Sequence, residues 1–280
     1  MVIPTGSAWP ALEPNIETVL RALERVDGEL ILASSGDDVT VPPCLRERIR
    51  LVHRPRADIF ALRARGLEAA RGTIVGLSED HCRLPPTWCT EVQKTFDADP
   101  RLMVLGGAVI NGATATAMDR ANFRMTFARF APEALLAPAP CISNVAVRRA
   151  ALPPTLEAGW FEYVFLPGWA GDSRLRMRSD LIVAHVQSHG ALATPLIHFH
   201  NGRLAGAFLA RFAVRSRGRS SVRWTLDAMR AHLGSTREGL AAVGVGGTAL
   251  WLVWLLALAH AAGMAVGERI GPGKSGHYLP

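Results

Sequence analysis

Near its C-terminus the chain has a long stretch without acidic or strongly basic side chains, and this stretch limits what the sequence can fold into. It runs from Leu240 to Gly267, contains His260 as its single titratable residue, and reads LWLVWLLAL over 250–258. A helix needs roughly 20 such residues to cross the hydrocarbon core of a bilayer. We therefore expect a transmembrane helix over 239–267, with a buried core helix as the alternative.

Positive charge gathers on the N-terminal side of this apolar run. The chain has a net charge of +7, and eight arginines fall between residues 203 and 237 against one acid, Asp227. A basic tract suits nucleic acid or an anionic membrane surface, and the apolar run beside it favours the membrane. We expect residues 201–238 to form a basic amphipathic interfacial segment and expect no nucleic-acid partner.

The same charge pattern predicts where the bulk of the chain resides. Arginine and lysine are enriched on the cytoplasmic side of membrane spans, so the residues before the run are expected to be cytoplasmic. The four cysteines form no C-x-x-C pair, which suits a reducing compartment.

Small residues recur every four positions in the second half of the apolar run and just beyond it. They are Ala259, Gly263, Gly267 and Gly271. On a helix this spacing gives one smooth face, which predicts close packing against another helix. Residues 268–280 are expected to form a short glycine-rich tail.

The first 200 residues alternate between short apolar runs and helical patterns. Strands are expected at 29–33, 50–52, 73–77, 102–105, 108–110 and 181–186, and helices at 16–26, 59–70 and 88–96. Gly106-Gly107 is expected to be a turn between two of the strands. This order indicates an α/β domain with a largely parallel sheet over 1–200, divided into halves at 1–105 and 106–200.

An acidic cluster follows one of these strands. Glu79-Asp80-His81 comes directly after the apolar run 73–77 and before Pro85-Pro86. In open α/β sheets, ligands bind at the carboxyl ends of strands. An acid pair at this place is a candidate to hold a metal ion and, through it, a phosphate, whereas the alternative is a solvated turn.

Several short motifs, in this order along most of the chain, resemble those of family 2 glycosyltransferases. The segments that carry the resemblance are Val2-Ile3-Pro4-Thr5, LRARGLEAARG at 62–72, LSEDHC at 77–82, Pro86-Thr87-Trp88, GGAV at 106–109, SNVAVRR at 143–149 and the tail 267–275. The resemblance implies the GT-A fold, a Rossmann-like mixed and mostly parallel sheet, followed here by an interfacial helix and one transmembrane helix.

The resemblance also implies a nucleotide-sugar donor whose diphosphate is held by a divalent metal at the acidic motif. The family's motif is acid, any residue, acid, and His81 stands at its third position. The implied metal ligands are Asp80, His81 and His185, with His189 as the second choice for the last of these. Mg²⁺ prefers oxygen ligands while Mn²⁺ accepts imidazole more readily, so both ions stay candidates and histidine tilts the choice toward Mn²⁺.

The remaining site residues also follow from the resemblance. Donor-binding positions are Pro4, Thr5, Ser34, Asp37, Arg63, Glu79 and Asp80. Ser34 stands where the family usually has an aspartate that recognises the nucleobase. Glu162, among aromatic residues that would raise its pKa, is the expected general base of an inverting transfer, and Asp172 is the reserve. Arg148 and Arg149 would either pair with phosphate or form a solvated helix start.

We compare three candidate functions. The leading one is a membrane-anchored, metal-dependent glycosyltransferase that moves a sugar to a lipid-linked or growing polysaccharide acceptor. A nucleotidyltransferase of the same fold would need a lysine in the first loop, and 5–9 contains none. A non-catalytic relative acting as a membrane scaffold is favoured by His81 and Ser34, which depart from the family pattern.

Overall fold

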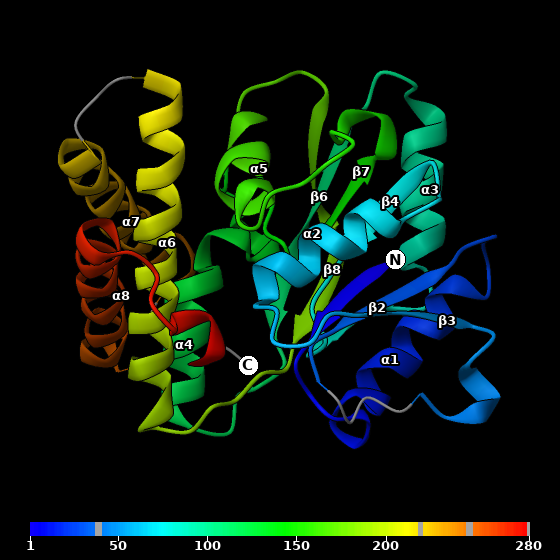
Figure 1. Ribbon diagram of the computed structural model, residues 1–280, viewed down its shortest axis with the longest axis horizontal. Coiled ribbons are helices and arrows are strands. Elements are labelled where there is room, and N and C mark those ends of the chain that lie inside the picture. The colour runs from blue at the N-terminus through cyan, green and yellow to red at the C-terminus, as the bar shows by residue number, and fades with distance from the viewer. Residues whose placement is uncertain (37–40, 218–220, 245–248, 279–280) are drawn as a thin grey trace. The chain divides into compact units, whose positions relative to one another are not determined.

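The computed structural model describes residues 1–36, 41–217, 221–244 and 249–278, which form two compact units. The first unit, residues 1–110 and 137–186, contains the sheet, and the second, residues 111–136 and 187–279, is helical (Figure 1). The predicted domain 1–200 therefore contains the whole sheet unit together with parts of the helical unit.

One mixed sheet forms the centre of the first unit. Its strands, in the order in which they lie side by side, are β3 (Ile49–His53), β2 (Leu30–Ser34), β1 (Val2–Thr5), β4 (Ile74–Leu77), β7 (Val145–Arg148), β6 (Val104–Asn111), β8 (Leu175–His185) and β5 (Cys82–Arg83). The first four are parallel, whereas β7 is antiparallel to β4 and β6, and β5 is antiparallel to β8. This is the GT-A arrangement, so the predicted fold class is confirmed.

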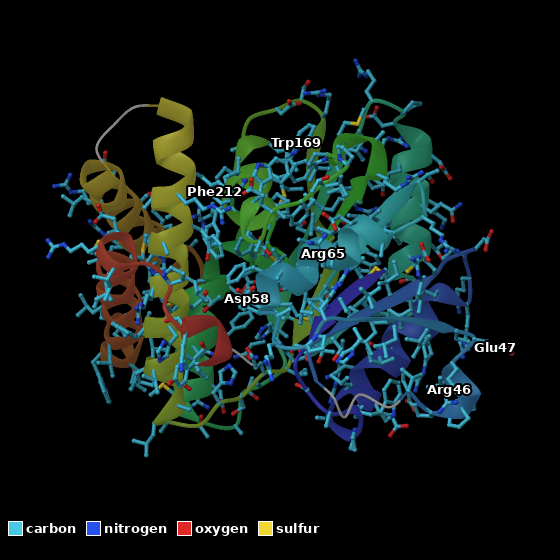
Figure 2. All side chains as sticks on the ribbon, in the orientation of Figure 1. Arg46, Glu47, Asp58, Arg65, Trp169 and Phe212 are labelled. Carbon is cyan, nitrogen blue, oxygen red and sulfur yellow. The ribbon has the colours of Figure 1, made fainter. Side chains whose placement is uncertain are left out.

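Helices α1 (Trp9–Leu23), α2 (Ile59–Ala69) and α3 (Trp88–Ala98) accompany the parallel half of the sheet. Helix α1 begins earlier than the predicted 16–26 because Pro10 occupies the first turn, where a missing N–H costs nothing. Asp58 caps α2 by accepting from the Ala61 N–H at 2.8 Å, and Arg65 lies further along the same helix (Figure 2). A side chain at Gly66 would collide with Val2 of β1, so this glycine lets α2 lie close to the sheet.

The expected turn at Gly106-Gly107 is wrong. Both glycines lie inside β6, which runs unbroken from Val104 to Asn111. A side chain at Gly106 would collide with Met177 and Pro140, and one at Gly107 with Asn144 and the Leu181 carbonyl. These glycines therefore allow neighbouring segments of the chain to pack closely against β6, and they do not form a turn.

Two consecutive short helical segments lie between β7 and β8, and the first of them carries Glu162. A π-helical turn at Phe161–Phe165 leads directly into α5 (Leu166–Gly168). Their aromatic rings pack together, with Phe161 stacked on Phe165 at 5.1 Å between ring centroids. This packing buries the segment that carries Glu162.

The second unit consists mainly of four helices around their own apolar core. They are α4 (Ala117–Phe127), α6 (Ala193–Arg217), α7 (Ser221–Val243) and α8 (Leu250–Ile270). The predicted interfacial segment 201–238 thus comprises the later part of α6 and most of α7. Residues 204–214 belong to the longer helix α6.

Helices α6 and α8 touch through their backbones at four glycines. Added side chains at Gly263 and Gly267 of α8 would collide with the carbonyls of Phe199 and Arg203, and added side chains at Gly202 and Gly206 of α6 would collide with those of His260 and Met264. Close packing of the small-residue face is therefore confirmed for Gly263 and Gly267. Gly271 instead ends α8, with a φ of 77°.

Among the described residues, α8 is the one helix long and apolar enough to cross a membrane. It begins later than the predicted 239–267, because residues 240–243 still belong to α7. One side of α8 is buried in the helical unit, and the other exposes Trp251, Leu255 and Leu258. The helix therefore combines the properties of a core helix with an uncovered apolar side.

Candidate metal centre

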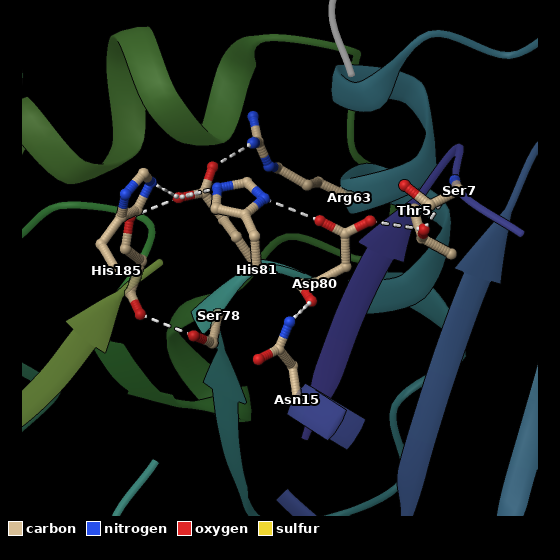
Figure 3. A network of polar contacts seen from close by, with 10 residues as sticks. Thr5, Ser7, Asn15, Arg63, Ser78, Asp80, His81 and His185 are labelled. Carbon is tan, nitrogen blue, oxygen red and sulfur yellow. Dashed lines mark hydrogen bonds and ion pairs between the residues drawn. The ribbon is translucent and has the colours of Figure 1, made fainter. Parts of the chain in front are cut away.

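The acidic motif lies at the carboxyl end of β4, where the ends of β1 and β8 also meet it (Figure 3). Asp80 is buried and accepts from the Thr5 hydroxyl at 2.5 Å, while the Asp80 carbonyl accepts from Asn15 Nδ2 at 2.9 Å. His81 Nδ1 lies 2.8 Å from the other Asp80 carboxylate oxygen. Both carboxylate oxygens of Asp80 are therefore engaged, and they hold the imidazole of His81 in place.

Glu79, His81 and His185 form a group that could hold a metal ion, because one ligand atom from each lies within 4.8 Å of the others. His81 Nε2 lies 3.6 Å from Glu79 Oε2, and His185 Nε2 lies 3.9 Å from the same oxygen. The pairing of β5 with β8 sets Cys82 opposite His185 and so brings His185 to the motif.

The donor set suits a transition metal. With Nδ1 of His81 on Asp80, its Nε2 is the nitrogen left for a metal, and a carboxylate behind a ligating imidazole is the usual second partner in metal sites. One carboxylate with two imidazoles matches Mn²⁺ or Zn²⁺ better than Mg²⁺. The sequence predicted Asp80 in this group; the structure instead gathers Glu79 with His81 and His185.

Charge is strongly coupled in this group. Burial alone would lower the pKa of His81, but hydrogen bonds to Asp80 and Glu79 raise that pKa to about 9. Burial alone would raise the pKa of Glu79, whereas the contact with His81 and the charge of Arg63 hold it well below its usual range. In the ligand-free protein near neutral pH, a protonated His81 therefore lies beside an ionised Glu79, and a metal ion would replace that proton.

Arg63 joins the metal group to the predicted base. Its guanidinium donates to Glu79 at 3.0 Å and to Glu162 at 3.2 Å, and Arg63 is only 4% exposed. Burial raises the pKa of Glu162, whose second oxygen, Oε2, is buried and has no hydrogen-bond partner in the described part of the chain. Arg63, expected to bind the donor, thus has two carboxylates as partners.

Two neighbouring residues that the sequence did not assign complete the site. The Ser143 hydroxyl donates to Glu79 Oε2, and Ser78 donates to the Ser143 carbonyl at 2.7 Å. Asn144 accepts from the Trp88 indole N–H at 2.9 Å and donates to the carbonyls of Ala108 and Leu181. Their signal was the SN pair within the motif at 143–149, which indicated a family feature without showing its contacts.

The remaining predicted residues fall into three groups. Pro4 and Thr5 pair with Ala33 and Ser34 across β1 and β2, so these residues lie at the same sheet edge. Asp37 lies outside the described residues. Asp172 is bound to Arg174 at 2.8 Å away from the cluster, and His189 belongs to the helical unit.

The two adjacent arginines, Arg148 and Arg149, have structural partners. Arg148 donates to the carbonyl of Phe96 near the end of α3 at 2.9 Å and to that of Leu102 in the following loop at 2.7 Å. Arg149 donates to the Gly72 carbonyl at 3.1 Å. Arg149 is exposed and begins the short 3-10 helix 149–151, which agrees with the solvated helix start, whereas Arg148 is half-buried; the phosphate contact stays a prediction.

The comparisons with known proteins agree with this fold. The model of the family described as glycosyl transferase family 2 matches residues 1–153. Because this match covers more than half of the chain, the protein belongs to glycosyl transferase family 2. No curated protein matches the chain in sequence.

Two solved structures resemble the chain in fold at low sequence identity. A mannosyltransferase from Pyrobaculum calidifontis, PcManGT, solved with GDP-Man and Mn²⁺, has a TM-score of 0.57 and 16% identity over 95% of this chain and 85% of its own. Glucosyl-3-phosphoglycerate synthase from Mycobacterium tuberculosis, solved with Mn²⁺ and UDP-glucose, has a TM-score of 0.50 and 17% identity over 76% of this chain and 77% of its own.

Proposed function

We propose that this protein transfers a sugar from a nucleotide-diphosphate sugar, with the diphosphate held through a divalent metal at Glu79, His81 and His185. The observation that carries the proposal is the convergence of these three side chains at the end of β4 in a family 2 sheet. Mn²⁺ is the favoured ion because two of the three ligands are imidazoles. When bound, the metal would neutralise charge that develops on the diphosphate as the sugar leaves.

Glu162 is proposed as the general base of an inverting transfer. It is buried, its raised pKa brings it toward the range in which a carboxylate accepts a proton, and one of its oxygens lacks a partner among the described residues. Arg63 holds the other oxygen and so fixes the orientation of the carboxylate. Thr5 and Ser34 are proposed to line the donor pocket beside Asp80.

The proposed acceptor is lipid-linked or a growing polysaccharide at the cytoplasmic membrane face. Support comes from the arginine-rich sequence at 203–237 and from the uncovered apolar side of α8, where Trp251 is 68% exposed. These features adjoin in the sequence, and one cause, attachment to a membrane, accounts for both.

A non-catalytic, scaffolding relative is the second candidate. It is favoured by His81 at the family's third acidic position and by Ser34 at the position of the base-recognising aspartate. Binding of a nucleotide diphosphate that requires the metal would argue against this candidate.

A screen of nucleotide sugars for Mn²⁺-dependent hydrolysis, together with calorimetry of nucleotide diphosphates, tests both. Glu79→Gln is expected to abolish metal-dependent binding, and Glu162→Gln to keep binding but lose at least about 100-fold in transfer rate. Glu17→Gln, an exposed ion-pair partner of Arg21, is the control and should leave both unchanged. If no nucleotide binds with or without metal, the transferase proposal is wrong.

A further inference from the structure

The helical unit contains a cavity of about 240 Å³ with an unusually basic lining. Helices α4, α6, α7 and α8 and the short turn 128–130 surround it. Its basic and imidazole side chains are Arg124, Arg129, His198, His232 and His260. None of the described residues that line this cavity is acidic, so the lining has no negative side chain that would repel an anion.

Several of these donors have no partner. His232 Nε2 and His260 Nδ1 are buried and make no hydrogen bond within the described residues. The half-buried Arg129 guanidinium has no hydrogen bond or ion pair in the part of the chain that the structure describes, and the charge that acts on it, Glu238, lies at an exposed position of α7. Leaving a buried polar group unpaired is unfavourable, so these nitrogens favour a ligand that can form hydrogen bonds with them.

The imidazoles in the cavity are neutral near pH 7. Burial lowers the pKa of His198 to about 3, and burial together with the charge of Arg129 lowers that of His232 to about 4. His198 is already paired with Asn122 at 2.7 Å. His232 and His260 stack with their ring centroids 4.5 Å apart, and each neutral ring offers one N–H donor and one acceptor nitrogen.

These donors select the chemistry of the ligand. A cation would be repelled by Arg129, and an apolar molecule would leave the nitrogens unpaired. A compact anion with several oxygens accepts from a guanidinium and from two imidazoles together, and guanidinium–phosphate pairs are among the stronger hydrogen bonds in proteins. We propose that this cavity binds a phosphate group through Arg129, His232 and His260.

The phosphate could be free or carried by a lipid, and both share this chemistry. On α8, Trp251 lies half a helical turn around from His260, so the helix offers an apolar face away from the cavity. The site lies wholly in the helical unit and does not depend on sugar transfer.

The experiment uses the full chain in detergent and two probes, inorganic phosphate and dihexanoyl phosphatidic acid, followed by ³¹P NMR and calorimetry. Saturable binding of at least one probe is expected. Arg129→Gln should weaken probe binding at least about tenfold. Arg129→Lys keeps the charge but loses the planar guanidinium, so its affinity should lie between those of the native chain and Arg129→Gln. Arg101→Gln is the control, because Arg101 belongs to the sheet unit, lies outside the arginine-rich sequence and has a side chain that is 91% exposed.

The outcomes separate the sources. Tighter binding of phosphatidic acid than of phosphate, with dihexanoyl phosphatidylcholine inactive, identifies a lipid phosphate; equal binding identifies a free one. The proposal is overturned if neither probe binds saturably, or if Arg129→Gln and Arg101→Gln weaken binding equally. Thermal unfolding provides a second measurement: phosphate should raise the Tm of the native chain and of Arg101→Gln, but not that of folded Arg129→Gln.

Discussion

At the scale of single residues, the site depends on buried charges that compensate one another. Arg63 lies between Glu79 and Glu162, and His81 lies between Glu79 and Asp80. Each buried charge is costly alone and tolerable beside its partner. Changing one member therefore affects the charge state of the others, which makes the arrangement testable.

Replacing Arg63 with methionine should leave two buried carboxylates without a counter-charge. We expect the free energy of unfolding to fall by about 3–5 kcal/mol, measured by urea denaturation at pH 7. The added variant Glu162→Gln should restore part of the loss, because one unpaired charge is then removed. Arg65→Met, at an exposed position of the same helix, is the control and should cost less than about 1 kcal/mol. Equal losses for the two arginines would contradict the proposed role of Arg63.

Metal binding should depend on pH through His81. Its pKa is raised from the ordinary 6.5 to about 9, so a proton must leave before Nε2 can bind a metal at neutral pH. The apparent Kd for Mn²⁺ should therefore rise about tenfold for each pH unit lowered from 9 to 6. Calorimetric Mn²⁺ titrations across this range provide the measurement.

His81→Asp restores the family's third acid and is the matched variant. We expect it to flatten the pH dependence between 6 and 9 and to strengthen Mg²⁺ binding relative to Mn²⁺, because an oxygen replaces a nitrogen ligand. A pH dependence identical to that of the native chain would show that His81 is not the titrating ligand.

At the scale of elements, glycines decide how closely the chain approaches itself. Gly66 brings α2 onto β1, Gly107 brings β6 beside Asn144, and Gly263 brings α8 onto α6. These elements have ordinary helix and strand patterns in the sequence. Their partners, however, are set by the places where a side chain is missing.

Gly263→Ala should separate α6 and α8, because the added methyl group would collide with the Phe199 carbonyl. We expect a loss of about 1–3 kcal/mol in the free energy of unfolding of the helical unit, measured by chemical denaturation. Gly234→Ala is the control: it lies in α7 with open space around it and should stabilise by up to about 1 kcal/mol through helix propensity. If both variants stabilise the protein, the two helices do not pack as described.

At the scale of the whole molecule, one chain combines a family 2 sheet unit with a helical unit that has its own core and an uncovered apolar side. The family match ends at residue 153, and the helices α6, α7 and α8 lie beyond it. Attachment to a membrane is therefore a property to be tested on these helices directly.

Replacing Trp251, Leu255 and Leu258 by serine should release the chain from vesicles that contain anionic lipid. Removing three large apolar side chains is expected to weaken partition into the membrane by several kcal/mol, since burying each one contributes about 1.5–3 kcal/mol. Vesicle flotation measures the change, and resistance of the native protein to alkaline carbonate separates a membrane-crossing helix from one lying at the surface. Unchanged flotation of the triple variant would rule out this face as the attachment site.

Local patterns in the sequence were enough for the alternating strands and helices, the acidic motif at the end of β4 and the small-residue face of α8, because each depends on residues close in the chain. Tertiary structure alone decided that ligand atoms of Glu79, His81 and His185 lie within 4.8 Å of one another, and that Arg63 pairs with Glu162 across 99 positions. It also showed that Gly106 and Gly107 lie within one strand. Likewise, it showed that Gly202 and Gly206 of α6, together with Gly263 and Gly267 of α8, let the two helices touch. The physical reason is that hydrogen bonds, ion pairs and close backbone contacts depend on distances in space, which the sheet register and helix packing set and which spacing along the chain does not record.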